Sequence, residues 1–160
     1  MTDHVLVRRA HEADVPSITL LVADAYDHYI ERIGRLPKPV AADQGSAVRD
    51  HEVWVAEDTR DKTLIGVLEL IVGPGSCFIE NVAVSPPRQG EGHGRRLLDL
   101  AESEARRRGA GEIGLETNER FVENLAIYAR RGYREGGRTL VGGTLVIQLS
   151  KRLDDRPDSA

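Results

Sequence analysis

The chain has 160 residues, of which 40% are hydrophobic and 30% are charged. This composition is typical of one folded globular domain and excludes a disordered, collagen-like or coiled-coil chain. The 22 basic and 26 acidic residues give a net charge of −4, so we expect neither nucleic acid nor an anionic membrane surface as a partner.

The first predicted elements are a short strand and a long helix. Val5 and Val7 indicate the strand. Asp14 is a candidate N-cap with Pro16 just inside the helix, which we expect to run from Val15 to about Ile30. The apolar face of this helix consists of residues at helical spacing: Ile18, Leu21, Val22 and Ala25.

The middle of the chain predicts an antiparallel meander. Prolines and glycines interrupt residues 34–50, where we expect a loop and at most a short helix. Three strand-like runs follow, at Glu52–Glu57, Leu64–Val72 and Cys77–Val84. A tight turn at Gly73–Ser76 joins the second and third runs as a hairpin. We therefore expect these consecutive strands to be antiparallel neighbours.

Helices and strands alternate in the last part of the chain. We predict a helix from Gly92 to Arg108, a strand at Ile113–Thr117, a helix from Glu119 to Arg131, and strands at Tyr133–Leu140 and Thr144–Leu149. Together these elements predict a mixed α/β fold of the α+β kind. We expect a mostly antiparallel, twisted sheet of about seven strands flanked by about four helices.

No repeat or long linker divides the chain, so we expect a single domain over residues 1–153 and a flexible tail at residues 154–160. The first residues lack a signal-peptide pattern, and Gly66 and Glu69 interrupt the longest apolar run. Cys77 is the only cysteine, and the histidines show no metal-ligand spacing. We therefore expect a cytoplasmic protein with no membrane span, no disulfide and no bound metal.

The segment NVAVSPPRQGEGHGRRLL, residues 81–98, indicates an anion site. A strand runs into a glycine-rich loop and then directly into an amphipathic helix. This arrangement aims backbone N–H groups and the positive end of the helix dipole at one point, where a pyrophosphate fits best. Arg88, Arg95 and Arg96 can add positive charge at the rim. The alternative is a loop that merely turns the chain.

Two common phosphate-binding motifs do not fit this loop. A Walker A loop requires Gly-Lys-Ser/Thr, whereas two arginines follow Gly94. A dinucleotide-binding Gly-x-Gly-x-x-Gly that begins at Gly90 requires glycine where Arg95 stands, and its strand would belong to a βαβ unit. Both kinds of nucleotide binding are therefore disfavoured.

The loop resembles the acyl-CoA signature of the GCN5-related N-acetyltransferase (GNAT) superfamily. The resemblance rests on Gln89-x-x-Gly92-x-Gly94, preceded by Val82-Ala83-Val84. The order of elements from about residue 5 to residue 151 is also similar. The resemblance implies that the strand before the loop carries a bulge and splays from the next strand, so that pantetheine can lie between the two central strands.

The resemblance further implies acetyl-CoA as the acyl donor. Backbone groups of Val82, Ala83 and Val84 would pair with the pantetheine arm, and the Val82 N–H would face the thioester carbonyl. The loop and the first helical turn would bind the remainder of the donor: Gln89, Gly90, Glu91, Gly92, His93, Gly94 and Arg95. His93 replaces the aliphatic residue usual in the family, and we interpret it as a packing variant rather than a catalytic histidine.

A second similarity to the family lies in residues 119–133. Tyr128 precedes Gly132-Tyr133 as the family's helix tyrosine does. The resemblance implies that Tyr128 protonates the departing thiolate. The alternative is that Tyr128 only packs the helix on the sheet. The family's helix asparagine usually stands seven residues earlier, where this chain has Phe121. Asn124, on the same helix face, would contact pantetheine or instead bond the strand that ends at Thr117.

Glu80 is the best candidate for the general base. An alkylammonium acceptor must lose a proton before it can attack, and in a regular strand Glu80 shares a face with Val82 and Val84. A solvent-facing strand residue or a partner for an arginine is the alternative interpretation. In the family, a water relay can also replace the base.

The resemblance places the acceptor after the first helix and beside the loop between the last two strands. We expect Tyr26 and Tyr29 to bind it, although both could instead pack the core. Glu31, the segment RIGRLPKP at residues 32–39, and Gly142-Gly143 belong to the same regions. Arg32 and Arg35 near Glu31 make an anionic amine, such as an amino acid, one candidate, but the sequence does not name the acceptor.

The function implied is transfer of an acetyl group from acetyl-CoA to a primary amine of a small molecule, by direct attack in a ternary complex. A lysine or N-terminal amine of a protein is an alternative acceptor. A CoA-binding sensor or interaction module without turnover is an alternative of another class. The family also allows a homodimer, although no long exposed apolar stripe requires one.

Overall fold

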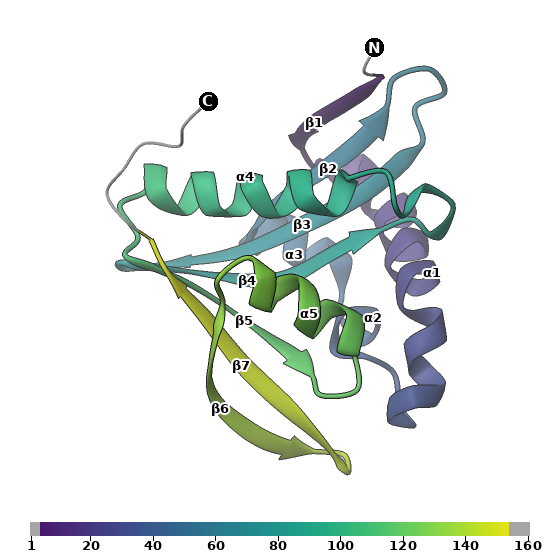
Figure 1. Ribbon diagram of the computed structural model, residues 1–160. Helices are drawn as coiled ribbons and strands as arrows, with labels where there is room; N and C mark the ends of the chain where they lie inside the picture. The colour runs from purple at the N-terminus through teal and green to yellow at the C-terminus, as the bar shows by residue number, and fades with distance from the viewer. Residues whose placement is uncertain (1–3, 154–160) are drawn as a thin grey trace.

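The computed structural model describes residues 4–153, so the predicted tail at residues 154–160 lies outside the described residues. Within this range a single sheet contains seven strands in the order β1-β2-β3-β4-β5-β7-β6 (Figure 1). Neighbouring strands are antiparallel except for the parallel pair β4 and β5, which confirms the predicted mixed sheet. The strands are β1 Val5–Arg9, β2 Glu52–Asp58, β3 Leu64–Gly73, β4 Ser76–Val84, β5 Glu112–Asn118, β6 Arg134–Val141 and β7 Thr144–Arg152.

Helices cover both faces of the sheet (Figure 1). The helices α4 and α5 lie on one face, and α1, α2 and α3 lie on the other. Residues 34–50 form two short helices rather than the single short helix expected. The helices are α1 Val15–Ile33, α2 Lys38–Ala41, α3 Gln44–Asp50, α4 His93–Arg107 and α5 Val122–Arg130, and the short 3-10 helices are η1 Glu12–Asp14 and η2 Pro86–Arg88.

Of two predicted helix starts, the first is confirmed at Val15, with Asp14 as the N-cap residue, and the second is wrong. Asp14 occupies the N-cap position of α1, but its side chain makes no capping bond; its carboxylate accepts hydrogen bonds from Arg8 and from the His11 N–H instead. The last helix begins at Val122 rather than near residue 119, because the Asn118 side chain and carbonyl bond the N–H groups of Arg120 and Phe121 and hold a turn there.

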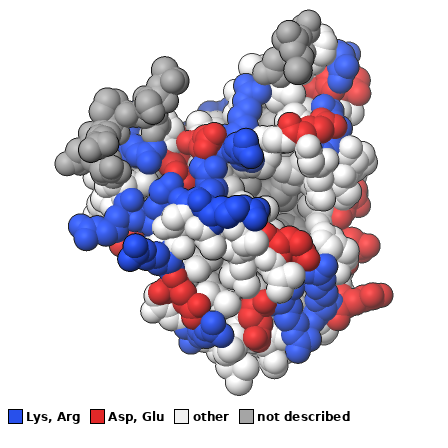
Figure 2. Space-filling view, viewed as in Figure 1, with Lys and Arg blue, Asp and Glu red and all other residues white. Residues whose placement is uncertain are grey.

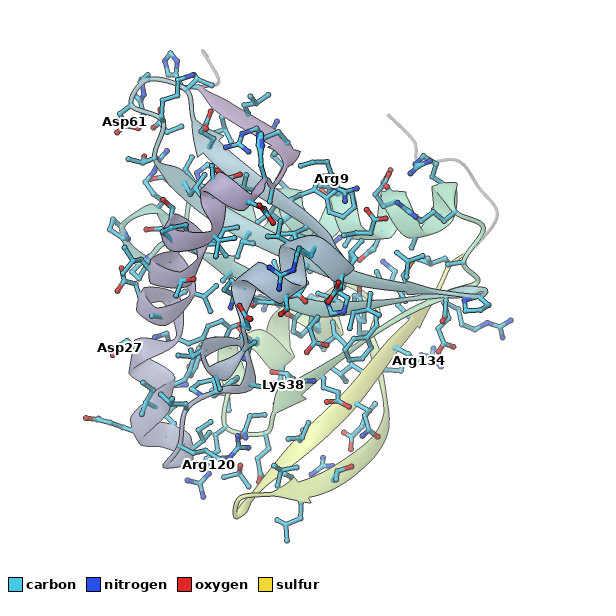
Figure 3. All side chains as sticks on the ribbon, turned by 180° about the vertical axis from the view of Figure 1, so that it is seen from behind. Arg9, Asp27, Lys38, Asp61, Arg120 and Arg134 are labelled. Atoms are coloured by element: carbon cyan, nitrogen blue, oxygen red, sulfur yellow. The ribbon has the colours of Figure 1, made fainter. Side chains whose placement is uncertain are left out.

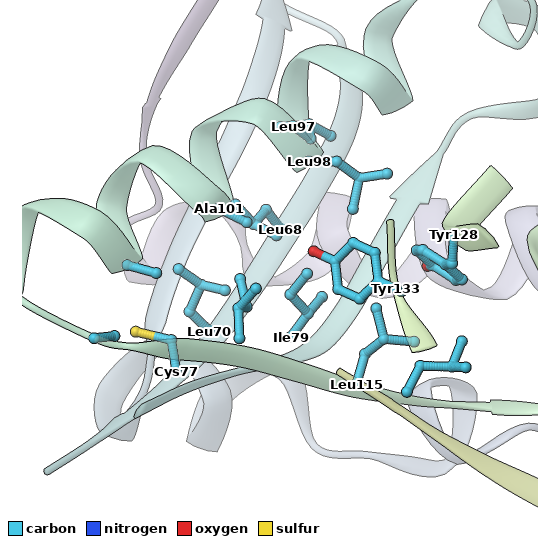
Figure 4. Packing of buried hydrophobic residues seen from close by; sticks show 14 of the residues in the cluster. Leu68, Leu70, Cys77, Ile79, Leu97, Leu98, Ala101, Leu115, Tyr128 and Tyr133 are labelled. Atoms are coloured by element: carbon cyan, nitrogen blue, oxygen red, sulfur yellow. The ribbon is translucent and has the colours of Figure 1, made fainter. Parts of the chain in front are cut away.

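The core between α4 and the sheet is aliphatic. Leu97, which is fully buried, packs with Leu98 and Ala101 against β3, β4 and β5 (Figure 4). Gly66 allows this close approach, since an added Cβ would lie 2.9 Å from Leu97 Cδ1 and 3.1 Å from the Ala83 carbonyl oxygen. On the opposite face, Ile18, Leu21 and Val22 of α1 belong to a second core cluster with β2 and β3. Burial of both faces holds the central strands rigidly in place.

A bulge and a splay open the centre of the sheet. Glu69 pairs with Asn81 and Leu70 with Ile79, so Glu80 is the extra residue of a β-bulge. The β4–β5 pairing extends only as far as Ile79 and Leu115, and beyond these residues the strands separate. This geometry confirms the expected splayed central strands.

The bulge corrects one expectation about Glu80. Ile79 and Val82 both pack toward the α4 core, whereas Ala83 packs toward α1. The regular alternation of β4 side chains between the two faces of the sheet is therefore interrupted between Ile79 and Val82. Glu80 therefore does not share a face with Val82, as a regular strand would require. Its carboxylate lies on the side of the sheet that carries α2, where Lys38 contacts it.

Candidate active site

The β4–α4 loop forms an open cradle of backbone N–H groups. Gly90 and Gly92 have φ angles of 83° and 91°, which favour glycine, and no atom lies within 4 Å of the position of an added Cβ at either residue. Gly92 is the N-cap of α4, and the first helical bond runs from the Arg96 N–H to the Gly92 carbonyl. The N–H groups that begin the helix are thus available to an anion, together with the positive end of the helix dipole.

Side chains of the loop brace one another. Arg88 donates to Glu91 and to Asp58 at 3.0 Å, and Glu91 Oε1 lies 2.9 Å from His93 Nε2. The hydrogen bonds from His93 and Arg88 lower the pKa of the Glu91 carboxyl below its ordinary value. The Gln89 side chain bonds the Val84 carbonyl at 3.1 Å. These contacts fix the shape of the loop before any ligand binds.

A cavity of about 770 Å³, hereafter the large cavity, extends from this loop to α5. Most of the predicted donor contacts line it: Val82, Ala83, Val84, Gln89, Gly90, Gly92, His93, Gly94, Arg95 and Asn124. Glu91 is absent from this lining, because its carboxylate holds Arg88 and His93. Arg88 lines the cavity as expected, and Arg131, which the sequence did not suggest, does so too.

A second cavity of about 250 Å³, hereafter the small cavity, lies on the other side of the splay. Its walls are formed by the end of α1 and the segment that follows, the bulged part of β4, the end of β5, and the β6–β7 hairpin. Four residues line both cavities: Tyr26, Val82, Asn124 and Tyr128. The two cavities therefore meet between β4 and β5, where a group could pass from a molecule in one to a molecule in the other.

Tyr128 lies at this junction with its side chain almost wholly buried. Burial raises the pKa of its phenol to about 12. Within residues 4–153 its hydroxyl makes no hydrogen bond, in contrast to the hydroxyl of Tyr133, which donates to Glu102 at 3.1 Å. Tyr128 thus lines the junction with a phenol that is protonated at neutral pH, and its ring packs against the Tyr133 ring.

The two tyrosines of α1 have different positions. The Tyr26 hydroxyl donates to Asn81 Oδ1 at 2.9 Å and to the Val82 carbonyl at 3.3 Å, and burial raises its pKa. Tyr29 lines only the large cavity; its hydroxyl donates to Glu123 at 3.0 Å and its ring lies 4.0 Å from that of Phe121. Of the two tyrosines predicted to bind the acceptor, only Tyr26 lines the small cavity.

Asn124 and Phe121 lie at the start of α5. Phe121 is buried at the N-cap of the helix and packs with Tyr29 and Ile33. Asn124 lines both cavities, and in the described part of the chain no hydrogen bond joins its side chain to Thr117. Its contact with pantetheine stays a prediction.

Carboxylates from both sides of the splay line the small cavity. Glu80 forms an ion pair with Lys38, with 2.9 Å between Glu80 Oε1 and Lys38 Nζ, and this contact raises the pKa of the lysine. Figure 3 shows Lys38 in the α2 segment that covers this side of the sheet. Glu116, one residue beyond the last β4–β5 pair, is exposed on the facing wall. Sequence reasoning missed Glu116, although its place at the end of β5 could have indicated it.

Charge is unevenly distributed over the surface. Lys and Arg side chains gather over the face that carries α4 and α5, and acidic side chains along the α1 side (Figure 2). Between residues 4 and 153, no helix is both long and apolar enough to cross a membrane. In the same range, no group of three His, Cys, Asp or Glu side chains is arranged to hold a metal ion.

Comparison with known proteins identifies the family. The sequence model of the Acetyltransferase (GNAT) family matches residues 19–133. N-alpha-acetyltransferase 80 of Mus musculus is 40% identical over 63 residues, which are 39% of this chain and 19% of that protein, so the match spans about a fifth of that relative's length.

Solved structures agree with this match at the level of the fold. The PaiA N-acetyltransferase of Thermoplasma acidophilum, in complex with coenzyme A, has a TM-score of 0.77 and 15% identity, with 96% of this chain and 100% of that chain covered. The IAA acetyltransferase of Bacillus cereus has a TM-score of 0.71 and 23% identity, with 93% of this chain and 99% of that chain covered. The family match extends over most of the described residues and includes the loop and the junction: the chain belongs to the GNAT acetyltransferase family.

Proposed function

We propose that this protein is an acetyl-CoA-dependent N-acetyltransferase that acts on a primary amine of a small molecule. The observation that carries the proposal is the meeting of two cavities at the splay of β4 and β5, with Val82 and Tyr128 in both linings. Such an arrangement suits direct transfer within a ternary complex, because each reactant has its own cavity and the reacting atoms meet at the junction. When bound, acetyl-CoA supplies the activated acetyl thioester.

The large cavity fits this donor. Gly90 and Gly92 leave the cradle open to phosphate oxygens, which a side chain at either position would displace. Arg88, Arg95 and Arg131 provide positive charge in the same lining. The β4 backbone from Val82 to Val84 runs along the cavity and, being splayed from β5, has groups available to the amides of pantetheine.

Three groups of the chain have assigned roles in the reaction. Glu80 accepts the proton that the acceptor ammonium must lose before attack. The Val82 N–H stabilises the negative charge that develops on the thioester oxygen. Tyr128 donates its proton to the departing sulfur, a role supported by its burial at the junction and by a pKa of about 12, which keeps the phenol protonated at neutral pH.

The role of Glu80 is tested with a matched pair of variants. Glu80→Gln should lower kcat/KM about tenfold at pH 7, because the cavity loses the carboxylate nearest the bulge while Glu116 remains as a substitute base. Glu116→Gln should have a smaller effect. Both are measured as pH profiles of CoA release from pH 6 to 9. A larger loss in Glu116→Gln would transfer the role to that carboxylate.

The small volume of the second cavity favours a small acceptor over a peptide laid across the surface. Arg35, in the segment after α1, donates to the Val141 carbonyl at 3.3 Å, and an added Cβ at Gly142 would lie 2.6 Å from Arg35 Nε. This contact joins the α1–α2 segment to the β6–β7 hairpin in the wall of the cavity. A protein α-amine remains a second candidate, because the matched N-alpha-acetyltransferase is named for that activity.

The proposed function is tested by two measurements on the wild-type protein. Calorimetry with acetyl-CoA should show binding in the micromolar range, and addition of amines should release free CoA, detected by a thiol reagent. Binding without release by any amine or N-terminal peptide would favour the non-catalytic CoA sensor. Absence of binding by the folded protein would contradict the acetyltransferase proposal.

A further inference from the structure

Two buried hydrogen-bond donors on the wall of the small cavity have no partner. Among residues 4–153, three buried side-chain polar atoms make no hydrogen bond: Asn81 Nδ2, Arg35 Nε and Glu52 Oε2. The third is ion-paired to Arg9. The first two are both donors, and Asn81 and Arg35 both line the small cavity. A buried donor without an acceptor destabilises the folded chain, so this concentration in one cavity points to a ligand that supplies acceptors.

Asn81 is held with its free N–H₂ group unpaired. Its side chain is 4% exposed, and its Oδ1 accepts the hydrogen bond from Tyr26. Tyr26 lines both cavities, so Asn81 lies close to the junction where the acetyl group is transferred. A substrate oxygen that accepts from Nδ2 would therefore be near the reacting amine.

Arg35 adds a positive charge to the wall of the same cavity. Its Nη2 bonds the Val141 carbonyl, whereas its Nε is buried and unpaired. A guanidinium favours a carboxylate over a neutral oxygen. On the other walls, Glu80 and Glu116 favour a substrate ammonium. The cavity thus combines sites for both charges of a zwitterion.

Apolar side chains form much of the rest of the lining, which also includes Lys38, Thr117, Asn118, Thr139 and Gln148. The apolar residues are aliphatic, proline and aromatic: Ile33, Pro37, Pro39, Phe78, Ile79, Leu115, Phe121, Val141 and Val146. Such walls suit an apolar side chain. A polyamine would fit poorly, because it carries no acceptor for Asn81 or Arg35 and would place cationic groups against the apolar walls.

We propose that the acceptor is an α-amino acid with an apolar side chain. Its carboxylate accepts hydrogen bonds from the free donors of Asn81 and Arg35, and its amine faces the junction near Glu80. The assignment rests on the proposed acetyltransferase function and specifies the substrate class of the same site. Asn81 and Arg35 are specificity-determining residues in this arrangement, since they distinguish an amine that carries a carboxylate from one that does not.

The test compares acceptors that differ only in the carboxylate. Leucine, leucinamide and isoamylamine form one series, and phenylalanine, phenylalaninamide and phenethylamine form another. With wild-type protein, kcat/KM per unprotonated amine should be at least about tenfold higher for the amino acid than for the amine without a carboxyl group. Equal or better use of the decarboxylated amine would overturn the assignment. Preference for the amide over the amino acid would overturn it in favour of a peptide-type α-amine.

Variants test the two donors separately. Asn81→Asp keeps an oxygen for Tyr26 but replaces the donor, and Arg35→Met removes the guanidinium while keeping a long side chain. Each should lower kcat/KM about tenfold for the amino acid and leave isoamylamine unchanged or improved. Since a buried carboxylate beside Glu80 can destabilise the fold, Arg35→Met provides an independent measurement. Arg49→Met, whose guanidinium bonds the Ser46 hydroxyl outside both cavities, is the matched control and should behave as wild type.

The outcomes separate the acceptor assignment from the proposed function. An equal loss for all three acceptors in Asn81→Asp and Arg35→Met would assign these residues a structural role and contradict the proposal. Absence of CoA release with every member of both series would also contradict it. Acetyl-CoA binding by calorimetry decides the proposed function independently, and both variants should retain wild-type affinity for the donor.

Discussion

Replacement of Gly92 by glutamate is expected to weaken acetyl-CoA binding at least about 100-fold. Gly92 is the N-cap of α4, at the point where the loop presents its N–H groups, and the space around its Cβ position is open. A glutamate there would occupy the cradle and bring a negative charge beside the phosphates. Like charges in close contact at an interface cost several kcal/mol, which corresponds to a loss of this size.

The control for this variant matches its backbone strain. Gly92 has a φ of 91°, a conformation that strains any side chain, so a loss of binding could reflect strain alone. Gly109, at the other end of α4, has a φ of 75° and equally open space, and Gly109→Glu introduces the same charge far from the cradle. Calorimetry should show wild-type affinity for Gly109→Glu. Retention of binding by folded Gly92→Glu would contradict the location of the donor site.

The sequence was sufficient to predict the loop that lines the large cavity, because the shape of this loop depends on local order. The strand at residues 82–84, the glycines at 90, 92 and 94, and the amphipathic helix after them are contiguous in the chain. Their geometry follows from turn conformation and helix capping, which neighbouring residues determine. The predicted contacts that line the large cavity come almost entirely from this segment and from Asn124.

The small cavity could not be predicted in the same way because it depends on pairing between distant residues. The bulge that isolates Glu80 arises from the register of β4 against Glu69, and a register shift has no signature in β4 alone. Lys38, the partner of Glu80, comes from a proline-interrupted segment with weak helical signal. The unpaired amide of Asn81 depends on the Tyr26 hydroxyl, which comes from α1.

Tyr128 is an intermediate case. Its place before Gly132-Tyr133 is visible in the sequence, but this sequence pattern fits both a packing role and a catalytic role for Tyr128. The structure separates two hydroxyls that the sequence could not: Tyr133 donates to the buried Glu102, whereas Tyr128 faces the junction of the cavities. This difference defines the experiment that tests its role.

Removal of the Tyr128 hydroxyl should lower kcat about 100-fold or more with little change in the affinity for acetyl-CoA. In Tyr128→Phe the ring still fills its place in the core, but the sulfur leaves as a thiolate without a proton donor, and general acid catalysis is typically worth 10²–10⁴-fold, about 3–5 kcal/mol. Tyr133→Phe makes the same chemical change in the ring that packs on Tyr128. It should reduce the free energy of unfolding by about 1–2 kcal/mol, through loss of the bond to Glu102, and leave kcat unchanged.

The pH dependence provides a second readout of the same role. Because burial raises the Tyr128 pKa to about 12, the wild-type phenol stays protonated from pH 6 to 10, and loss of its proton cannot produce an alkaline decline of kcat in that range. The decline should appear only as the pH approaches the raised pKa. An alkaline limb near pH 8 that is present in wild type and absent from Tyr128→Phe would contradict a protonated acid at this position. Equal kcat values for Tyr128→Phe and Tyr133→Phe would assign the Tyr128 hydroxyl no part in thiolate departure, leaving that proton to solvent at the junction.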